Sequence, residues 1–262
     1  MSETSQNQSK IALITGATSG IGKATAAIFA QQQYQLILTG RRNELLVDLK
    51  KDLEKQYGIK VLTLNFDVRN KNEVETHLGN LTNEWKAIDV LVNNAGLASG
   101  FGSIDQGDTD DWDAMIDTNV KGLLYVTKVV TPYMIARKSG HIINIASIAG
   151  KEVYLNGNVY CASKHAVDAL SKAMRIDLLP HHIKVTNIAP GMVDTEFSLV
   201  RFHGDQEKAD AVYRDFEPLH AQDIAEVIWF AVNRPSHVNL NDIVIMPTVQ
   251  ANTSHLLREV KS

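Results

Sequence analysis

Short apolar runs alternate with longer amphipathic segments along almost the whole chain, and this alternation most constrains the fold. Seven of the runs are rich in Val, Ile and Leu, as expected for strands buried on both faces of a sheet. They are Ile11–Thr15, Gln35–Thr39, Lys60–Phe66, Ala87–Val92, Gly140–Ala146, Ile183–Ile188 and Asp242–Met246. Because parallel strands need crossover connections, the alternation predicts an α/β fold: one doubly wound, seven-stranded parallel sheet with helices on both faces.

Helices are expected in the intervals between these strands, where apolar residues follow a helical period. They span Gly20–Gln33, Asn43–Tyr57, Lys71–Glu84, Thr109–Arg137, Asn158–Pro180 and Ala221–Asn233. Asn43 and Asn70 are expected to be N-caps, because Asn side chains accept hydrogen bonds from first-turn amides. The stretch 191–221 is too long for an ordinary connection and follows a strand, so it is expected to be a substrate lid.

Composition narrows the partners and the domain count. The 262 residues carry a net charge of −4 without a basic block, so nucleic acid is not an expected partner. The one cysteine, Cys161, fits a cytoplasmic protein, and no apolar run approaches the ~18 residues of a membrane span. We expect a flexible N-terminal tail at 1–9, one domain at 10–250 that includes the lid, and a C-terminal tail at 251–262.

A glycine-rich loop, TGATSGIG at residues 15–22, joins the first expected strand to the first expected helix. Its glycines allow a tight turn and close approach of the backbone to a pyrophosphate, while the helix N-terminus offers amides to the anion. A turn that merely links strand and helix is the alternative. We interpret the loop as a variant of the dinucleotide fingerprint of Rossmann-like folds, with contacts from Gly16, Thr18, Ser19, Gly20, Ile21 and Gly22.

Two arginines, Arg41 and Arg42, follow the second expected strand, where an NAD-binding fold would normally place an acidic residue. Guanidinium groups at this position pair with a 2′-phosphate, so we expect NADP (NADPH) as the cofactor. The alternative is a solvated pair of arginines at a helix start. Asp67 and Val68, just past the third strand, are expected to lie near the adenine ring.

Tyr160 and Lys164 are four residues apart at the start of an expected helix, so their side chains share one face. A phenol has a pKa near 10, and a neighbouring ammonium is expected to favour its phenolate form. Ser147, just beyond the fifth strand, can donate a hydrogen bond to the same reacting oxygen. The pattern predicts acid/base chemistry at an alcohol or carbonyl, although an isolated Y-x-x-x-K is more often a surface pair.

These motifs occur together in an order that resembles the single-domain short-chain dehydrogenase/reductase family, over about residues 10–250. The matching segments are TGATSGIG at 15–22, NNAG at 93–96, DTNVKG around Asn119, NIASIAG around Ser147, YCASK at 160–164, and Pro190-Gly191 followed by Thr195. The resemblance implies an NADP-dependent oxidoreductase that interconverts a hydroxyl and a carbonyl by hydride transfer. It also implies a homotetramer.

The resemblance assigns roles to individual residues. Tyr160 is implied to be the general acid in reduction and the base in oxidation, Ser147 the donor that polarises the carbonyl, and Lys164 the ligand of the nicotinamide ribose. Asn119 is implied to hold a water in the proton relay. Further cofactor contacts are implied for Asn94, Ala95, Gly96, Pro190, Gly191, Val193 and Thr195.

Within that family the chain is similar to NADP-dependent 3-hydroxy acid dehydrogenases, which act on serine, allo-threonine and 3-hydroxypropionate or malonic semialdehyde. The segments that show this similarity include TGRR at 39–42 and DTEFSLVRFHGD at 194–205. A small anionic hydroxy acid needs a cationic anchor beside the reacting carbon, and Arg201 is expected to supply it, helped by Tyr154 and Gln250. Gln250 could act in its own or a neighbouring subunit. No metal site is expected.

Other functions stay open at this point. An anion anchor does not separate a carboxylate from a sulfonate, so reduction of sulfoacetaldehyde or another small aldehyde or ketone is an alternative. A non-catalytic NADP-binding regulator is a second alternative, which the presence of Ser147, Tyr160 and Lys164 disfavours. A sugar-nucleotide epimerase or dehydratase of the extended type would need a larger C-terminal domain than 262 residues leave.

Overall fold

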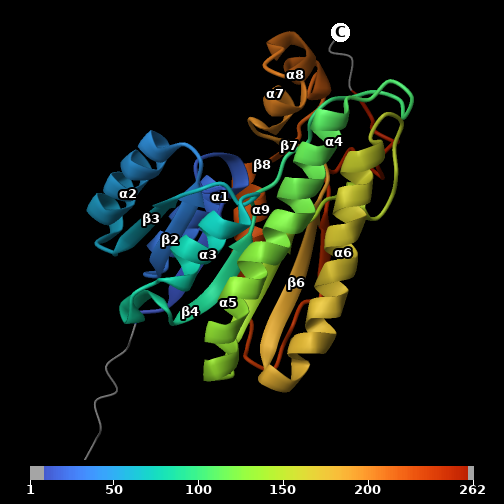
Figure 1. Ribbon diagram of the computed structural model, residues 1–262. Helices are drawn as coiled ribbons and strands as arrows, with labels where there is room; N and C mark the ends of the chain where they lie inside the picture. Colours follow the sequence, from blue (N-terminus) through green and yellow to red (C-terminus); the bar gives the residue numbers. More distant parts are fainter. Residues whose placement is uncertain (1–8, 259–262) are drawn as a thin grey trace, which may run out of the picture.

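A computed structural model describes residues 9–258. Residues 1–8 of the expected N-terminal tail and residues 259–262 of the expected C-terminal tail lie outside the described part. Figure 1 shows a layered molecule in which helices cover both sides of a central sheet. Within residues 9–258, no helix combines the length and the apolar character that a membrane crossing requires.

The central sheet has seven parallel strands in the order β3-β2-β1-β4-β5-β6-β9, which confirms the predicted fold class. The chain order reverses between the neighbours β1 and β4, and ligands of such sheets bind at the carboxyl edge beside this reversal. The strands are β1 (Ile11–Thr15), β2 (Gln35–Gly40), β3 (Val61–Asn65), β4 (Ile88–Asn93), β5 (Gly140–Ile145), β6 (Ile183–Pro190) and β9 (Asp242–Ile245).

Two apolar cores flank the sheet and explain the near-continuous hydrophobic strands. One core packs α1, α2 and α9 on the first face, and the other packs α3, α5 and α6 on the second face. The helices are α1 (Gly20–Gln31), α2 (Asn43–Tyr57), α3 (Lys71–Gly79), α4 (Thr109–Ile116), α5 (Leu123–Arg137), α6 (Asn158–Leu178) and α9 (Ala221–Val232).

The helices differ from the expectation in their caps and in several of their ends; α1, α6 and α9 each end one or two residues early. Asn70 caps α3 as predicted, and its side chain accepts hydrogen bonds from two first-turn amides. Asn43 is not an N-cap, because the non-helical backbone angles belong to Arg42 and Asn43 is already helical. Helix α3 ends before a separate 3₁₀ turn at Asn83–Trp85, and the expected helix Thr109–Arg137 contains a π-helical segment between α4 and α5.

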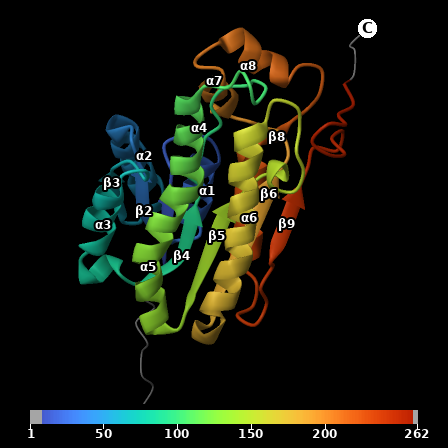
Figure 2. The ribbon, with the colours of Figure 1, turned by 45° about the vertical axis from the view of Figure 1, so that its right-hand side comes forward.

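The segment 191–221, called the lid below, lies over the carboxyl ends of the strands (Figures 1 and 2). It contains two short helices, α7 (Phe197–Arg201) and α8 (Gln206–Val212). Strands β7 (Val193–Asp194) and β8 (Leu219–His220) pair with each other, so the two ends of the lid lie side by side. Residues 251–258 of the expected C-terminal tail fold back to the lid, where Arg258 donates to backbone carbonyls of Val212 and Arg214.

Candidate active site

A cavity of about 930 Å³ opens at the carboxyl edge of the sheet, beneath the lid. Its walls come from the glycine-rich loop, the ends of β2 to β6, the start of α6 and the lid. Except for Gly22 and Asn119, every site residue expected from the sequence lines this cavity. Segments that are far apart in the chain therefore meet around one space of the size of a cofactor and substrate site.

The glycine-rich loop has the geometry of a phosphate cradle. Gly16 and Gly20 adopt φ angles of +65° and +49°, which residues with a Cβ rarely do. A Cβ added to Gly22 would lie 2.3 Å from the carbonyl oxygen of Gly16, so this glycine lets α1 approach the loop. Ser19 caps α1 without a side-chain hydrogen bond, which leaves the first-turn amides available to an anion. The loop fits a dinucleotide pyrophosphate.

Asn94 holds this loop from the neighbouring strand end. Its Nδ2 donates to the carbonyl oxygens of Thr15 (2.8 Å) and Gly16 (3.1 Å). The Thr15 hydroxyl in turn accepts from the backbone amides of Asn94 and Ala95, each at 3.0 Å. The segment 94–96 therefore supports the phosphate loop as well as lining the cavity.

Arg41 and Arg42 lie at the end of the cavity that the adenosine is expected to occupy. Arg42 Nη2 donates to Thr18 Oγ1 at 3.0 Å, and Arg42 Nη1 lies 2.9 Å from the carboxylate of Glu196 in the lid. Arg41 Nη1 lies 3.9 Å from Asp67 Oδ2. The two guanidinium groups give this end of the cavity the positive charge that a 2′-phosphate needs.

Asp67 is paired with Arg41 and with a third arginine. Arg69, a residue that the sequence analysis did not single out, donates to Asp67 Oδ2 at 2.9 Å and 2.7 Å. Burial opposes ionisation, but hydrogen bonds from Arg69 and the charge of Arg41 keep the pKa of Asp67 below its usual range. The three arginines outnumber the carboxylates of Asp67 and Glu196, so an anion is still favoured here.

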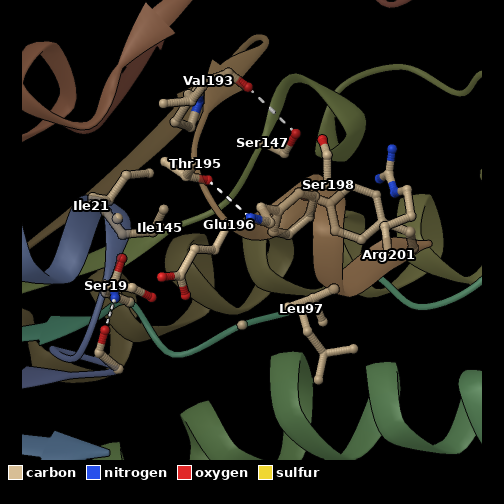
Figure 3. A pocket seen from close by; sticks show the side chains of 18 of the residues that line it. Ser19, Ile21, Leu97, Ile145, Ser147, Val193, Thr195, Glu196, Ser198 and Arg201 are labelled. Atoms are coloured by element: carbon tan, nitrogen blue, oxygen red, sulfur yellow. Dashed lines mark hydrogen bonds between the residues drawn. The ribbon is translucent and has the colours of Figure 1, made fainter. Parts of the chain in front are cut away.

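Ser147, Tyr160 and Lys164 converge at the other end of the cavity (Figure 3 labels Ser147). Ser147 follows β5, and its Oγ accepts from the amide of Ala149 at 3.1 Å and donates to the carbonyl of Pro190 at 3.4 Å. Tyr160 and Lys164 are buried on α6. The Lys164 ammonium donates to the carbonyl oxygen of Ile145 at 2.9 Å and lies 5.9 Å from the centroid of the Tyr160 ring.

The charge that acts on the Tyr160 phenol differs from the one expected. Burial raises the pKa of Tyr160 well above its ordinary value, and electrostatic repulsion from the neighbouring Tyr154 phenol raises it further. The charge of Arg201 and hydrogen bonding with Ser147 oppose this rise. Lys164, expected to favour the phenolate, is itself buried, and desolvation lowers its own pKa to about 8. Arg201 is therefore the main cation that favours the phenolate in this arrangement.

Arg201 lies over the reacting residues from the last turn of α7. Its Cζ is 5.1 Å from the centroid of the Tyr160 ring and 5.3 Å from that of Phe197. Its Nη2 donates to the Tyr154 hydroxyl at 2.9 Å. A guanidinium fixed in this way, within the same cavity as Ser147, can bind a substrate anion close to the carbon that reacts.

Asn119 lies behind the cavity wall, in the π-helical segment Asp117–Gly122. Its side-chain oxygen accepts from the amide of Leu97 at 2.9 Å, and its amide donates to the Leu97 carbonyl at 2.8 Å and to Ser163 at 3.0 Å. The side chain thus ties the segment after β4 to α6. A π-helical turn of this kind is frequent at functional sites, and the sequence pattern did not reveal it.

Gln250 lines the cavity but uses its side chain within its own chain. Its Oε1 accepts from the backbone amide of Met192 at 2.9 Å, and its Nε2 donates to the carbonyl of Asn252 at 3.1 Å. A Cβ added to Gly191 would lie 2.5 Å from Gln250 Oε1, so the two residues are in close contact. Gln250 therefore supports the start of the lid.

Two lid residues that the sequence analysis did not assign also shape the site. The Phe197 ring packs edge-on against Tyr160 with 5.6 Å between centroids, and Glu196 pairs with Arg42. Both lie in the segment DTEFSLVRFHGD at 194–205, just after Thr195, and this segment was the signal in the sequence that could have pointed to them. In residues 9–258, no three His, Cys, Asp or Glu side chains are grouped as metal ligands.

The sequence profile of the short chain dehydrogenase family matches residues 10–205, which is most of the chain. The chain belongs to this family. An NADP-dependent 3-hydroxy acid dehydrogenase of Salmonella typhi is 46% identical over 242 residues, which cover 92% of this chain and 96% of the relative. Another of Schizosaccharomyces pombe is 42% identical over 251 residues, which cover 95% and 97% of the two chains.

Two further similarities bear on the site of this short-chain dehydrogenase. Sulfoacetaldehyde reductase 2 of Chromohalobacter salexigens is 45% identical over 244 residues, which cover 93% of this chain and 96% of the relative. The closed form of a serine dehydrogenase complexed with NADP⁺ is 43% identical, with a TM-score of 0.88 and coverage of 95% and 100%. These similarities extend over the lid as well as the cofactor-binding strands.

Proposed function

We propose that this short-chain dehydrogenase oxidises small 3-hydroxy acids, and reduces the corresponding semialdehydes, with NADP(H). The observation that carries the proposal is the position of Arg201: one guanidinium contacts Tyr154 and lies over the Tyr160 ring inside the cavity. An anion bound there is placed beside the only buried tyrosine that shares the cavity with Ser147 among the described residues. The names of relatives at 42–46% identity support the same substrate class.

The cofactor contacts follow from the residues that line the cavity. The first-turn amides of α1 bind the pyrophosphate, and Arg41 and Arg42 bind the 2′-phosphate. The nicotinamide ribose and ring are held by Lys164 and the segment 94–96 (Asn94, Ala95 and Gly96). On the side of the lid they contact Pro190, Gly191, Val193 and Thr195. When bound, the nicotinamide supplies or accepts the hydride.

The protein moves the proton and fixes the substrate. In oxidation, Tyr160 takes the hydroxyl proton of the substrate, and in reduction it donates that proton to the carbonyl oxygen. Ser147 donates a hydrogen bond to the same oxygen and thereby stabilises the charge that develops on it. Arg201 binds the carboxylate and also favours the phenolate of Tyr160, so substrate binding and acid/base chemistry share one cation. Asn119 is proposed to hold a water in the proton relay.

A substrate panel tests this proposal. The purified protein is supplied with NADP or NAD and with 3-hydroxypropionate, L-serine or L-allo-threonine, and the reduced-nicotinamide absorbance is followed. We expect turnover with at least one of these acids and a strong preference for NADP. Absence of turnover with all of them, under conditions where NADP binds, contradicts the proposed function.

A sulfonate substrate is the second candidate, and the 45% identity with a sulfoacetaldehyde reductase favours it specifically. Arg201 binds a sulfonate as readily as a carboxylate, because both anions accept two parallel hydrogen bonds. Reduction of sulfoacetaldehyde and of malonic semialdehyde with NADPH, compared by kcat/KM, decides between them.

We also propose a homotetramer. Leu124 on α5, Ile176 on α6 and Leu179 just after α6 are 38%, 74% and 72% exposed in the single chain. Apolar side chains of this size on two long neighbouring helices suit a two-fold interface between copies. The molar mass from light scattering tests the assembly.

A further inference from the structure

Glu196 is the lid residue that reaches the cofactor end of the cavity. It directly precedes α7, and its Oε2 lies 2.9 Å from Nη1 of Arg42 at the start of α2. Both side chains line the cavity. Figure 3 shows the Glu196 carboxylate extending towards Ser19, the residue that caps the phosphate-binding helix. An anionic side chain therefore lies among groups that are proposed to bind phosphates.

Each of the three guanidinium nitrogens of Arg42 already has a partner. Nε and Nη2 donate to Thr18 Oγ1 at 3.3 Å and 3.0 Å, and Nη1 donates to Glu196. A phosphate binds a guanidinium best through two parallel N–H donors. A 2′-phosphate on this guanidinium must share its five N–H donors with Thr18 and Glu196. Glu196 is the partner that a phosphate also repels by its charge.

The residues on both sides of Glu196 fix its position. A Cβ added to Gly20 would lie 3.2 Å from the Thr195 Cγ2, so Thr195 packs on the phosphate loop. The next residue, Phe197, packs against the Tyr160 ring. Glu196 thus lies in a short strap between the phosphate loop and the catalytic tyrosine, and the ion pair with Arg42 holds this strap at its cofactor end.

We propose that Glu196 is a specificity residue that competes with the 2′-phosphate for Arg42. The inference rests on the proposed function, which assigns Arg42 to that phosphate. NADP(H) displaces the Glu196 carboxylate, whereas NAD(H), which has no 2′-phosphate, leaves the ion pair in place. The ion pair between the lid and Arg42 therefore depends on which dinucleotide is bound.

Calorimetric titration of the full-length protein with NADP and with NAD tests the competition. The variants are Glu196→Gln and, as a matched control, Glu217→Gln, which neutralises another exposed carboxylate of the lid. We expect Glu196→Gln to lower the Kd for NADP by about two- to fivefold, the range that exposed ion pairs support. The Kd for NAD is expected to stay unchanged, and the control variant is expected to change neither constant.

An Arg42→Ala background tests whether Glu196 acts through Arg42. There the substitution Glu196→Gln is expected to have no effect on the Kd for NADP. Three results overturn the inference: weaker NADP binding in Glu196→Gln, an equal gain for both dinucleotides, or the same gain in the Arg42→Ala background. The proposed function fails separately, because its test is the turnover of hydroxy acids by the unsubstituted protein.

Discussion

Replacing Arg201 by Met tests the link between substrate charge and catalysis. Methionine keeps much of the apolar bulk over the Tyr160 and Phe197 rings and removes only the guanidinium, which now contacts Tyr154 and both rings. A hydrogen bond to a charged group contributes about 1.5–3 kcal/mol, and each 1.4 kcal/mol is tenfold in binding. We therefore expect kcat/KM for 3-hydroxypropionate to fall by about ten- to hundredfold.

The same substitution has a second effect that the assay must separate. Because the charge of Arg201 lowers the pKa of Tyr160, its removal leaves the pKa of this buried phenol higher still. The phenolate needed for oxidation then forms only at higher pH, so the rise of the oxidation rate with pH moves to more alkaline values. Reduction, which needs the neutral phenol, is not slowed in this way.

The assay compares 3-hydroxypropionate with its uncharged methyl ester at several pH values. The effect on Tyr160 is common to both substrates, so the ratio of their kcat/KM values reports the anion contact alone. Arg214→Met, which removes an exposed arginine of the same lid, is the control. An equal loss for acid and ester would show that Arg201 does not bind the carboxylate, and no loss for either would place the anion site elsewhere.

The remaining predictions concern the cofactor loop, the two arginines and the buried lysine. Gly22→Ala is expected to abolish NADP binding in a calorimetric titration, since its Cβ would lie 2.3 Å from a loop carbonyl oxygen; normal binding would contradict the cradle. Arg41→Ala with Arg42→Ala is expected to weaken NADP far more than NAD, and equal losses would refute the cofactor assignment. Lys164→Met is expected to raise the unfolding free energy at pH 7 by about 2 kcal/mol. Folding lowers the pKa of this ammonium from 10.5 to about 8, so the substitution removes the cost of a buried charge. The hydrogen bond that is lost with the ammonium offsets about 1 kcal/mol of this gain. The cost of the buried charge is fully present below pH 8 and disappears as pH rises towards 10.5, so denaturant melts should show the gain at pH 7 and lose it near pH 10.

Local patterns in the sequence were enough to predict the sheet and to single out residues that line one cavity. The glycines of the phosphate loop and the four-residue spacing of Tyr160 and Lys164 each depend on a few neighbouring residues, and the strand–helix alternation places them at one edge. The apolar runs likewise identified all seven strands of the central sheet within a few residues of their ends.

Long-range contacts account for what the sequence did not show. The pair of Arg42 and Glu196 joins residues 154 positions apart, and its existence depends on how the lid folds. The π-helical turn around Asn119 follows no apolar period, and the side chain of Asn119 makes its hydrogen bonds to Leu97, 22 residues earlier. The cation that joins Lys164 beside Tyr160 was missed for the same reason, since only the folded lid places Arg201 over the ring.

The Tyr160→Phe variant, measured for turnover and for NADP affinity in the same preparation, tests most directly whether the phenol of Tyr160 transfers the proton. Phenylalanine keeps the ring that packs against Phe197 and Arg201 and removes only the hydroxyl. We expect kcat for 3-hydroxy acids to fall about a thousandfold, because proton transfer by a positioned acid typically contributes about 10²–10⁴ in rate. The Kd for NADP is expected to be unchanged. Turnover near that of the unsubstituted protein would show that Tyr160 is not the acid/base group.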